Sequence, residues 1–285
     1  MQRPITWPSS NNDRNPDTMK GDITSGKLSP SLSFLICGLE HSGTTMVSDL
    51  FREHPDVDSG FECGVLLCSQ PSDFLNYEPF CNHMVVGWGI DQSDFEQACS
   101  APSFDEFYDR LFRASSLIKQ KSARHIFDKT PRYITDLGRV QQRSGRPIIA
   151  VIKDPRSLAL SDFKRSKRSL DEIDAWYEGW KEPKLAYMRS AYLGYQYAWQ
   201  DDGCFVVRLE DICFDARNTV GALYDFVGLE FKSEYLSLRS KRFNNTSGSS
   251  ISVGACMQFL DGLPRSIQDR ICIDFAEFER WFFPF

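Results

Sequence analysis

The segment from Phe34 to Phe51 has the residue types and the spacing of an anion-binding site. It begins with a short apolar run, continues as a turn rich in glycine and hydroxyl side chains, and ends in a helical pattern of apolar residues, which predicts a strand, a loop and a helix. Such a loop directs successive backbone N–H groups and the positive end of the helix toward one point. The segment therefore favours the binding of a phosphate or sulfate group, although similar turns also cap helices that bind no ligand.

The loop differs from the P-loop of proteins that bind nucleoside triphosphates. Gly38 and Gly43 have the P-loop spacing, but Thr44 and Thr45 occupy the positions where the P-loop has a lysine followed by serine or threonine. In the P-loop that lysine reaches the β- and γ-phosphates. Its absence argues against ATP or GTP hydrolysis and counts against the alternative hypothesis of a nucleotide or small-molecule kinase.

The run His41-Ser42-Gly43-Thr44-Thr45 resembles instead the 5′-phosphosulfate-binding loop of the sulfotransferases, which is a basic residue followed by Ser-Gly-Thr-Thr. The resemblance implies that these five residues bind the donor 3′-phosphoadenosine 5′-phosphosulfate (PAPS). Histidine stands where most members of the family have a permanent cation, and its charge changes near neutral pH.

The end of a second apolar run, residues 151–157, resembles the sulfotransferase segment that holds the 3′-phosphate of the donor. In that segment a cation, usually arginine, ends a strand, and a serine follows eight residues later. Lys153 and Ser161 have these positions, so the resemblance implies that they bind the 3′-phosphate. Lysine binds phosphate less directionally than arginine, which can form two parallel hydrogen bonds.

Two further segments match the family in the same order along the chain. Residues 127–133 resemble its Lys-Thr-Pro element, which implies that Lys129 donates to the bridging oxygen of the donor as negative charge develops there. Residues 207–211 are similar to its strand ending in Arg-x-Glu-Asp, for which we expect a structural role in ion pairing. Each element alone is a weak signal, but four in the family's order indicate a sulfotransferase.

Glu62 is the candidate general base. Residues 54–62 are similar to the region after the donor loop in tyrosylprotein sulfotransferases, where a glutamate two residues past a glycine serves as the base. Cys63 and Gly64 follow Glu62 in place of the Thr-Arg of that subfamily, so specificity for tyrosine is not implied. A sulfuryl group carries less negative charge than a phosphoryl group, so Mg²⁺ is less needed and we expect no metal.

The resemblance implies an enzyme that transfers a sulfuryl group from PAPS to a hydroxyl of an acceptor. We expect the acceptor to be a carbohydrate or a lipid-linked glycan rather than a protein tyrosine. The other alternative is a non-catalytic nucleotide-binding protein on the same fold. His41 and Lys153 favour that alternative because both differ from the usual cations, whereas Lys129 and Glu62 favour an enzyme.

The composition limits the class of protein. A chain of 285 residues with 41% hydrophobic residues can bury the core of one domain, and its net charge of −6 argues against general nucleic-acid binding. Nine cysteines without a C-x-x-C pair and four scattered histidines predict reduced thiols and no structural metal. No apolar run is long enough to cross a bilayer, and the N-terminus lacks the apolar core of a signal peptide, so we expect a soluble, cytoplasmic protein.

The elements that must position these residues alternate along the chain. Short apolar runs separated by helical patterns predict a three-layer α/β/α fold with a central, mainly parallel sheet. Residues 1–30 are polar and predict a disordered tail, which leaves residues 31–285 as a single catalytic domain. Residues 232–262 predict either an active-site lid or a disordered surface loop. A long helical region over 170–200 is expected to break near Pro183.

Overall fold

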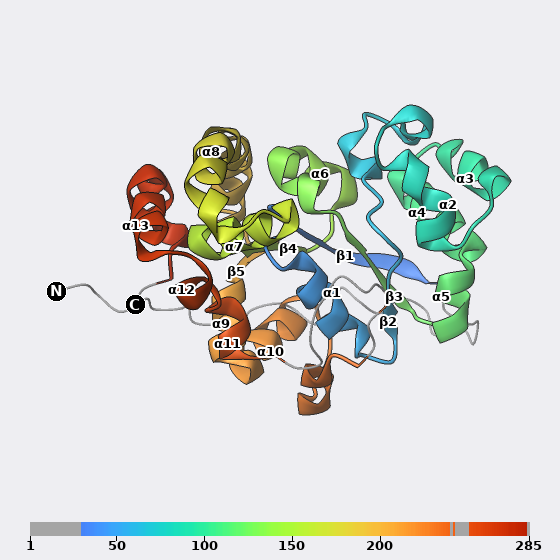
Figure 1. Ribbon diagram of the computed structural model, residues 1–285. Coiled ribbons are helices and arrows are strands. Elements are labelled where there is room, and N and C mark those ends of the chain that lie inside the picture. The colour runs from blue at the N-terminus through green and yellow to red at the C-terminus, as the bar shows by residue number, and fades with distance from the viewer. Residues whose placement is uncertain (1–29, 240–241, 243–250, 284–285) are drawn as a thin grey trace.

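The computed structural model describes residues 30–239, 242 and 251–283 (Figure 1). The predicted tail therefore lies almost entirely outside the described residues, as does the middle of the predicted lid. Among the described helices, none combines the length and the hydropathy that a membrane span requires.

A five-stranded parallel sheet forms the centre of the molecule, with the strand order β2-β3-β1-β4-β5. The sheet confirms the predicted α/β architecture. Strand β4 and residues 34–37 of β1 are continuously apolar, as is typical of parallel strands that are buried on both faces. The strands are β1 (Ser31–Gly38), β2 (Val57–Asp58), β3 (His125–Lys129), β4 (Ile148–Ile152) and β5 (Cys204–Arg208).

Helices follow most of the strands and cover both faces of the sheet (Figure 1). The α-helices of the described residues are α1 (Thr44–Arg52), α2 (Met84–Trp88), α3 (Gln92–Cys99), α4 (Phe104–Ala114), α5 (Ser116–Lys121), α6 (Leu137–Ser144), α7 (Pro155–Ser166), α8 (Ile173–Ala198), α9 (Leu209–Phe214), α10 (Ala216–Phe226), α11 (Val253–Cys256), α12 (Phe259–Gly262) and α13 (Arg265–Asp274).

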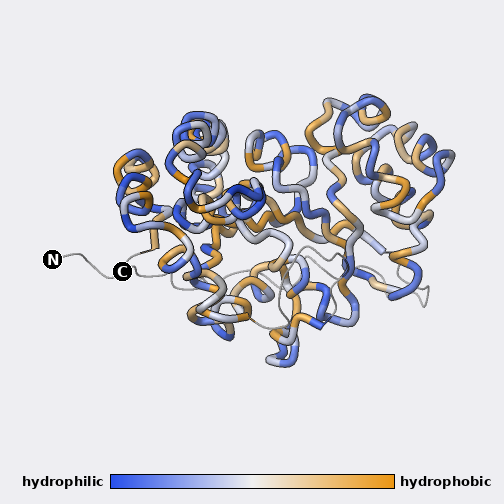
Figure 2. Tube along the Cα trace, viewed as in Figure 1, coloured by the Kyte–Doolittle hydropathy of each residue, from blue (hydrophilic) through white to orange (hydrophobic). Residues whose placement is uncertain are grey.

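The core has two parts, one on each face of the sheet. Successive residues of β1 point to opposite faces, so Phe34 and Ile36 belong to one hydrophobic cluster and Leu35 and Cys37 to the other. Helices α1 and α10 complete the first cluster, and α4, α6, α7 and α8 contribute to the second. Figure 2 shows the predominantly hydrophobic strands between these helices. The arrangement is the predicted three-layer fold.

The parallel sheet brings the candidate residues to one edge. Ile36 of β1 is opposite Lys129 of β3, and Gly38 of β1 is opposite Val151 of β4. Because the strands are parallel, their carboxyl ends lie together, where ligands bind in open α/β sheets. The loop after β1, Lys129 at the end of β3 and Lys153 after β4 are therefore neighbours.

Helix α8 does not break at Pro183, so the predicted break is wrong. Proline lacks the N–H that would bond to the carbonyl of Gly179, four residues earlier, and this usually kinks a helix. Here the helix is buried on both sides of the proline, at Tyr177 before it and at Met188 after it. Tertiary packing therefore keeps the helix continuous despite the missing hydrogen bond.

Candidate active site

The loop after β1 leaves the start of α1 open for a ligand. Gly43 is the N-cap residue of α1 and has a φ of 100°, a conformation that glycine adopts without steric cost. It has no side chain to cap the helix, so the first-turn N–H groups of α1 have no side-chain cap. An N-terminus of this kind attracts anions through its free N–H groups and its dipole.

Ser42 has a buried hydroxyl in the middle of this loop. Its side chain is 0% exposed, and its Oγ has no hydrogen-bond partner among the described residues. Buried polar groups in native proteins almost always have partners. The orphaned hydroxyl beside an uncapped helix start therefore fits a site that is completed by an anionic ligand. Thr44 is also buried, and Thr45 is partly buried.

His41 lies at the start of the loop and is held by an acidic residue of α7. It has a φ of 68°, which is uncommon for a residue other than glycine. Its Nδ1 is 2.6 Å from Oδ1 of Asp162. Oδ2 of Asp162 also accepts hydrogen bonds from Trp180 and from Lys184, each at 2.9 Å. Burial raises the pKa of Asp162, but the hydrogen bonds from His41 and Lys184 outweigh burial and lower it, so the carboxylate stays charged.

Lys153 and Ser161 lie together, as the resemblance implies. The ammonium of Lys153 donates a 2.8 Å hydrogen bond to Oγ of Ser161 and is 3.5 Å from the carbonyl oxygen of His41. Burial lowers the pKa of Lys153. Among the described residues, no carboxylate lies within ion-pair distance of this ammonium. A partly buried cation without an ion pair is unfavourable, so the site is suited to a phosphate that would neutralise it.

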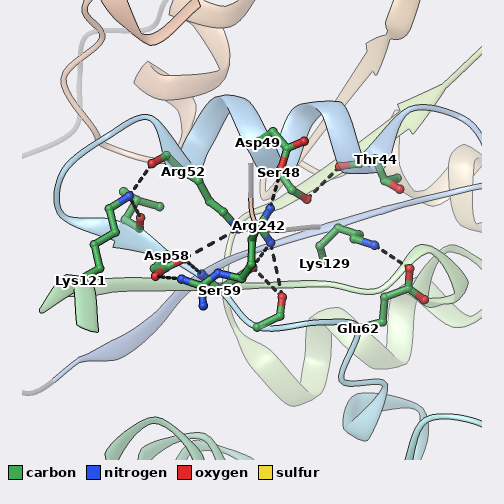
Figure 3. Close-up of polar contacts among 12 residues, drawn as sticks. Thr44, Ser48, Asp49, Arg52, Asp58, Ser59, Glu62, Lys121, Lys129 and Arg242 are labelled. Atoms are coloured by element: carbon green, nitrogen blue, oxygen red, sulfur yellow. Dashed lines mark hydrogen bonds and ion pairs between the residues drawn. The ribbon is translucent and has the colours of Figure 1, made fainter. Parts of the chain in front are cut away.

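Glu62 and Lys129, the two candidate catalytic residues, form an ion pair (Figure 3). Nζ of Lys129 is 2.6 Å from Oε1 of Glu62. Lys129 ends β3, whereas Glu62 lies on the loop after β2, the strand next to β3 in the sheet. The side chain of Glu62 is 25% exposed and that of Lys129 is 6% exposed, so only the carboxylate is open to an acceptor from solvent.

Arg52, the last residue of α1, contacts the loop that carries Glu62. The guanidinium of Arg52 donates to Oγ of Ser59 at 2.6 Å and to the carbonyl oxygen of Gly60 at 3.4 Å. It also donates to Oδ1 of Asp49 at 2.9 Å. Burial lowers the pKa of Arg52 to about 10, although Asp49 and Asp58 oppose this. Helix α1 therefore links the donor loop at its start to the Glu62 loop at its end.

Arg242 joins the predicted lid segment to this buried cluster. Its guanidinium is ion-paired with Asp58 at the end of β2, as Figure 3 shows. Asp58 is fully buried, and burial raises its pKa while Arg242 opposes the effect. Arg242 therefore stabilises the buried carboxylate of Asp58.

The Arg-x-Glu-Asp segment, for which we expect ion pairing, forms no ion pair among the described residues, and two of its side chains bond to backbone groups. Arg208 donates to the carbonyl oxygen of Arg280 at 2.6 Å. Oε1 of Glu210 accepts a hydrogen bond from the backbone N–H of Asp154 at 3.1 Å, and its Oε2 has no partner among the described residues. Burial raises the pKa of Glu210 to about 7. Both side chains contact backbone groups, and Glu210 fixes the residue that follows Lys153.

Two residues of the site have no signal in the sequence. Asp162 and Arg52 are single charged residues on helices; Asp162 contacts His41, 121 positions away, and Arg52 contacts Ser59 in the loop that carries Glu62. Among the described residues, no cluster of three or more His, Cys, Asp or Glu side chains is arranged to hold a metal ion.

Comparisons with known proteins identify the family and the fold of the chain. The model of the sulfotransferase family matches residues 33–233. The sulfotransferase domain of the olefin synthase from Synechococcus PCC 7002 has a TM-score of 0.56 and 16% identity, with 92% of this chain and 98% of that chain covered. The sulfotransferase domain from the curacin biosynthetic pathway has a TM-score of 0.54 and 14% identity, with 87% and 98% covered. No curated protein sequence matches significantly.

The two structural matches share the fold, and the family match covers more than half of the chain, including the donor loop, Glu62, Lys129, Lys153 and Ser161. The chain therefore belongs to the sulfotransferase family.

Proposed function

We propose that this sulfotransferase transfers a sulfuryl group from PAPS to a carbohydrate hydroxyl, with Glu62 as the general base and Lys129 as the electrophilic group. The ion pair between these two side chains carries the proposal. It places a carboxylate and an ammonium together at the sheet edge that also holds an open helix start.

The donor-binding residues divide into two groups by the part of PAPS that they suit. The hydroxyls of Ser42, Thr44 and Thr45 and the first N–H groups of α1 suit the 5′-phosphosulfate. The ammonium of Lys153 and the hydroxyl of Ser161 suit the 3′-phosphate. His41 lies between the groups, because its carbonyl oxygen faces Lys153 while its ring is bonded to Asp162.

In the proposed reaction a new bond forms between the acceptor oxygen and sulfur while the bond from sulfur to the bridging phosphate oxygen breaks. Glu62 accepts the proton of the acceptor hydroxyl, which makes that oxygen a better nucleophile. Lys129 stabilises the negative charge that grows on the bridging oxygen. The products are a sulfate ester and 3′-phosphoadenosine 5′-phosphate (PAP).

A groove beside the donor loop supports a carbohydrate acceptor. It has a volume of about 530 Å³, and its lining includes the partly exposed rings of Trp180 and Tyr187 of α8 together with Asp162 and Lys184. The phenol oxygen of Tyr187 is 3.5 Å from the backbone nitrogen of Glu40, so the groove reaches the donor loop. Flat aromatic faces with polar edges suit the apolar face and the hydroxyls of a sugar ring.

The test combines donor binding with product formation. PAP without metal should stabilise the protein, by about 2.7 kcal/mol at one hundred times its Kd, because it binds only the native state. ATP with Mg²⁺ should stabilise it far less. Transfer of sulfur-35 from labelled PAPS should then be measured for a panel of carbohydrate, lipid-linked glycan, phenol and tyrosyl-peptide acceptors. Equal stabilisation by ATP with Mg²⁺ would favour a kinase, and transfer only to phenols or peptides would overturn the carbohydrate proposal.

A further inference from the structure

A buried carboxylate, Asp128, lies beneath the candidate catalytic pair. Its side chain is 0% exposed. It accepts hydrogen bonds from the hydroxyls of Tyr108 at 2.7 Å, Tyr133 at 2.6 Å and Thr130 at 2.8 Å. The backbone N–H of Cys63 is also within 3.4 Å. A buried carboxylate with this many donors is a rigid centre rather than a solvated charge.

Thr130 connects this carboxylate to the loop that carries Glu62. Its Oγ1 accepts hydrogen bonds from the backbone N–H groups of Cys63 and Gly64, each at 3.1 Å. A hydroxyl has one proton to donate and two lone pairs to accept with. Because Asp128 takes the proton, both lone pairs of Thr130 remain for the two N–H groups directly after Glu62.

The backbone after Glu62 has a glycine, Gly64, at one of the two positions that bond to Thr130. Gly64 has a φ of 81°, and a Cβ at this position would be 2.5 Å from the ring of Phe80. Only glycine fits here without rearrangement. The Glu62 loop is thus bonded to Arg52 at Ser59 and Gly60, and to Thr130 at Cys63 and Gly64.

We propose that Asp128 and Thr130 are positioning residues that hold the Glu62 carboxylate against Lys129. This inference depends on the proposed function, because it takes Glu62 as the base. Lys129 lies between the two residues in the chain, and successive side chains of a strand point to opposite sides. The end of β3 therefore carries the proposed catalytic ammonium of Lys129 on one side. On the other side Asp128 and Thr130 hold the loop that carries Glu62, and we call this hydrogen-bonded pair the clamp.

Thr130→Val tests the clamp, and Tyr108→Phe is its matched control. Each variant removes one hydroxyl that donates to Asp128 and keeps the shape of the buried side chain. Only Thr130 also bonds to the Glu62 loop. Thr130→Ser restores the hydroxyl and should rescue the function. Three quantities should be measured for each variant: the hydrogen-exchange rates of the Cys63 and Gly64 amides, the Kd of PAP, and kcat as PAP released from PAPS.

We expect Thr130→Val to accelerate exchange of the Gly64 amide by roughly tenfold or more, because that amide loses its hydrogen bond to Thr130. Exchange of the Cys63 amide should accelerate less, because Asp128 remains within 3.4 Å of it. It should lower kcat by roughly 30- to 100-fold, the effect of a misplaced catalytic group, and leave the Kd of PAP within about twofold. Tyr108→Phe should change kcat by about threefold or less and leave the two amides protected. Thr130→Ser should behave like the wild type within about fivefold.

The amide exchange does not depend on any acceptor, so it separates this inference from the proposed function. Unchanged exchange in Thr130→Val would overturn the clamp even if turnover fell. Accelerated exchange with normal kcat would show that the clamp does not position a catalytic group. Equal losses of kcat in Thr130→Val and Tyr108→Phe would show that the hydrogen bonds around Asp128 support the fold and do not position Glu62, which would overturn the inference. A wild type that releases no PAP but shows the expected exchange pattern would contradict the proposed function and, with it, the positioning role.

Discussion

The donor loop and the Glu62 loop lie at the same sheet edge but differ in how their polar groups are satisfied. In the donor loop the start of α1 has no side-chain cap, and Ser42 has no partner among the described residues. In the Glu62 loop the carboxylate is paired with Lys129, and the backbone on both sides is hydrogen-bonded. We therefore propose that a ligand completes the donor loop, whereas the Glu62 loop already has its polar groups paired without one. Binding and chemistry should therefore respond to different substitutions.

Glu62→Gln should have the largest effect on chemistry. We expect kcat to fall about a hundredfold or more, because the amide cannot accept the acceptor proton. Steady-state transfer of sulfur-35 from PAPS is the measurement. Glu96→Gln, a substitution of an exposed glutamate on α3, is the matched control and should leave kcat unchanged. If Glu62→Gln kept more than half of the wild-type kcat, Glu62 would not be the base.

Lys153→Ala should have the largest effect on the donor side. PAP binding should weaken by roughly 1.5 to 3 kcal/mol, the range for a lost hydrogen bond to a charged group. Titration calorimetry with PAP measures this difference. Lys164→Ala is the control, because Lys164 lies on α7, the helix that follows Lys153, and bonds to Gln258. Equal losses in the two variants would indicate a general effect of surface charge rather than a 3′-phosphate site.

Glu210→Gln should change how the free energy of unfolding depends on pH. Burial raises the pKa of Glu210 to about 7, so between about pH 4.5 and 7 the folded protein retains a proton that the unfolded chain has released. This carboxyl therefore makes the protein less stable as pH rises through that window. We expect Glu210→Gln to be as stable as the wild type near pH 4.5 and about 1 to 3 kcal/mol more stable at pH 8.

Urea unfolding at both pH values measures the difference. A gap between Glu210→Gln and the wild type that does not widen with pH would contradict the burial of a titrating carboxyl at this position. Asp225→Asn is the control, because Asp225 is an exposed carboxylate on α10.

Ser42→Ala should have the smallest effect. The direction of its effect on the stability of the free protein tests whether the donor loop, unlike the Glu62 loop, has an unsatisfied polar group. The hydroxyl of Ser42 has no partner among the described residues, so its removal should leave the stability of the free protein unchanged or slightly higher. PAP affinity should fall by about 0.5 to 1.5 kcal/mol, the value of one hydrogen bond. Thermal unfolding with and without PAP measures both. A loss of stability in the free protein would mean that Ser42 supports the loop rather than the ligand.

Elements of the fold that follow from a local sequence pattern could be predicted. Residues 34–37 and 148–152 are apolar runs, and they form the central strands as expected. The predicted break at Pro183 failed because burial of α8 on both sides outweighs one missing hydrogen bond. Local penalties of this size are routinely overridden by tertiary packing.

Candidate site residues could be predicted where they lie together in a short motif. Contacts between residues that are far apart in the chain could not be predicted. The donor loop and the Lys153–Ser161 pair lie within short segments, so their spacing is visible in the sequence. The bond from Thr130 to Cys63 joins residues 67 positions apart, and the ion pair of Arg242 with Asp58 joins residues 184 positions apart. No periodicity connects such positions, and only the tertiary fold brings them together.

The most direct test of the central claim is a crossed measurement on two variants. Glu62→Gln and Lys153→Ala should each be assayed for the Kd of PAP and for kcat at saturating PAPS. We predict that Glu62→Gln keeps the Kd within about twofold and loses about a hundredfold or more in kcat, because the base acts in the transition state alone. Lys153→Ala should show the opposite pattern, with a Kd raised about tenfold or more and a kcat within about fivefold. If both variants lost donor affinity and turnover together, binding and chemistry would not be divided between the two loops.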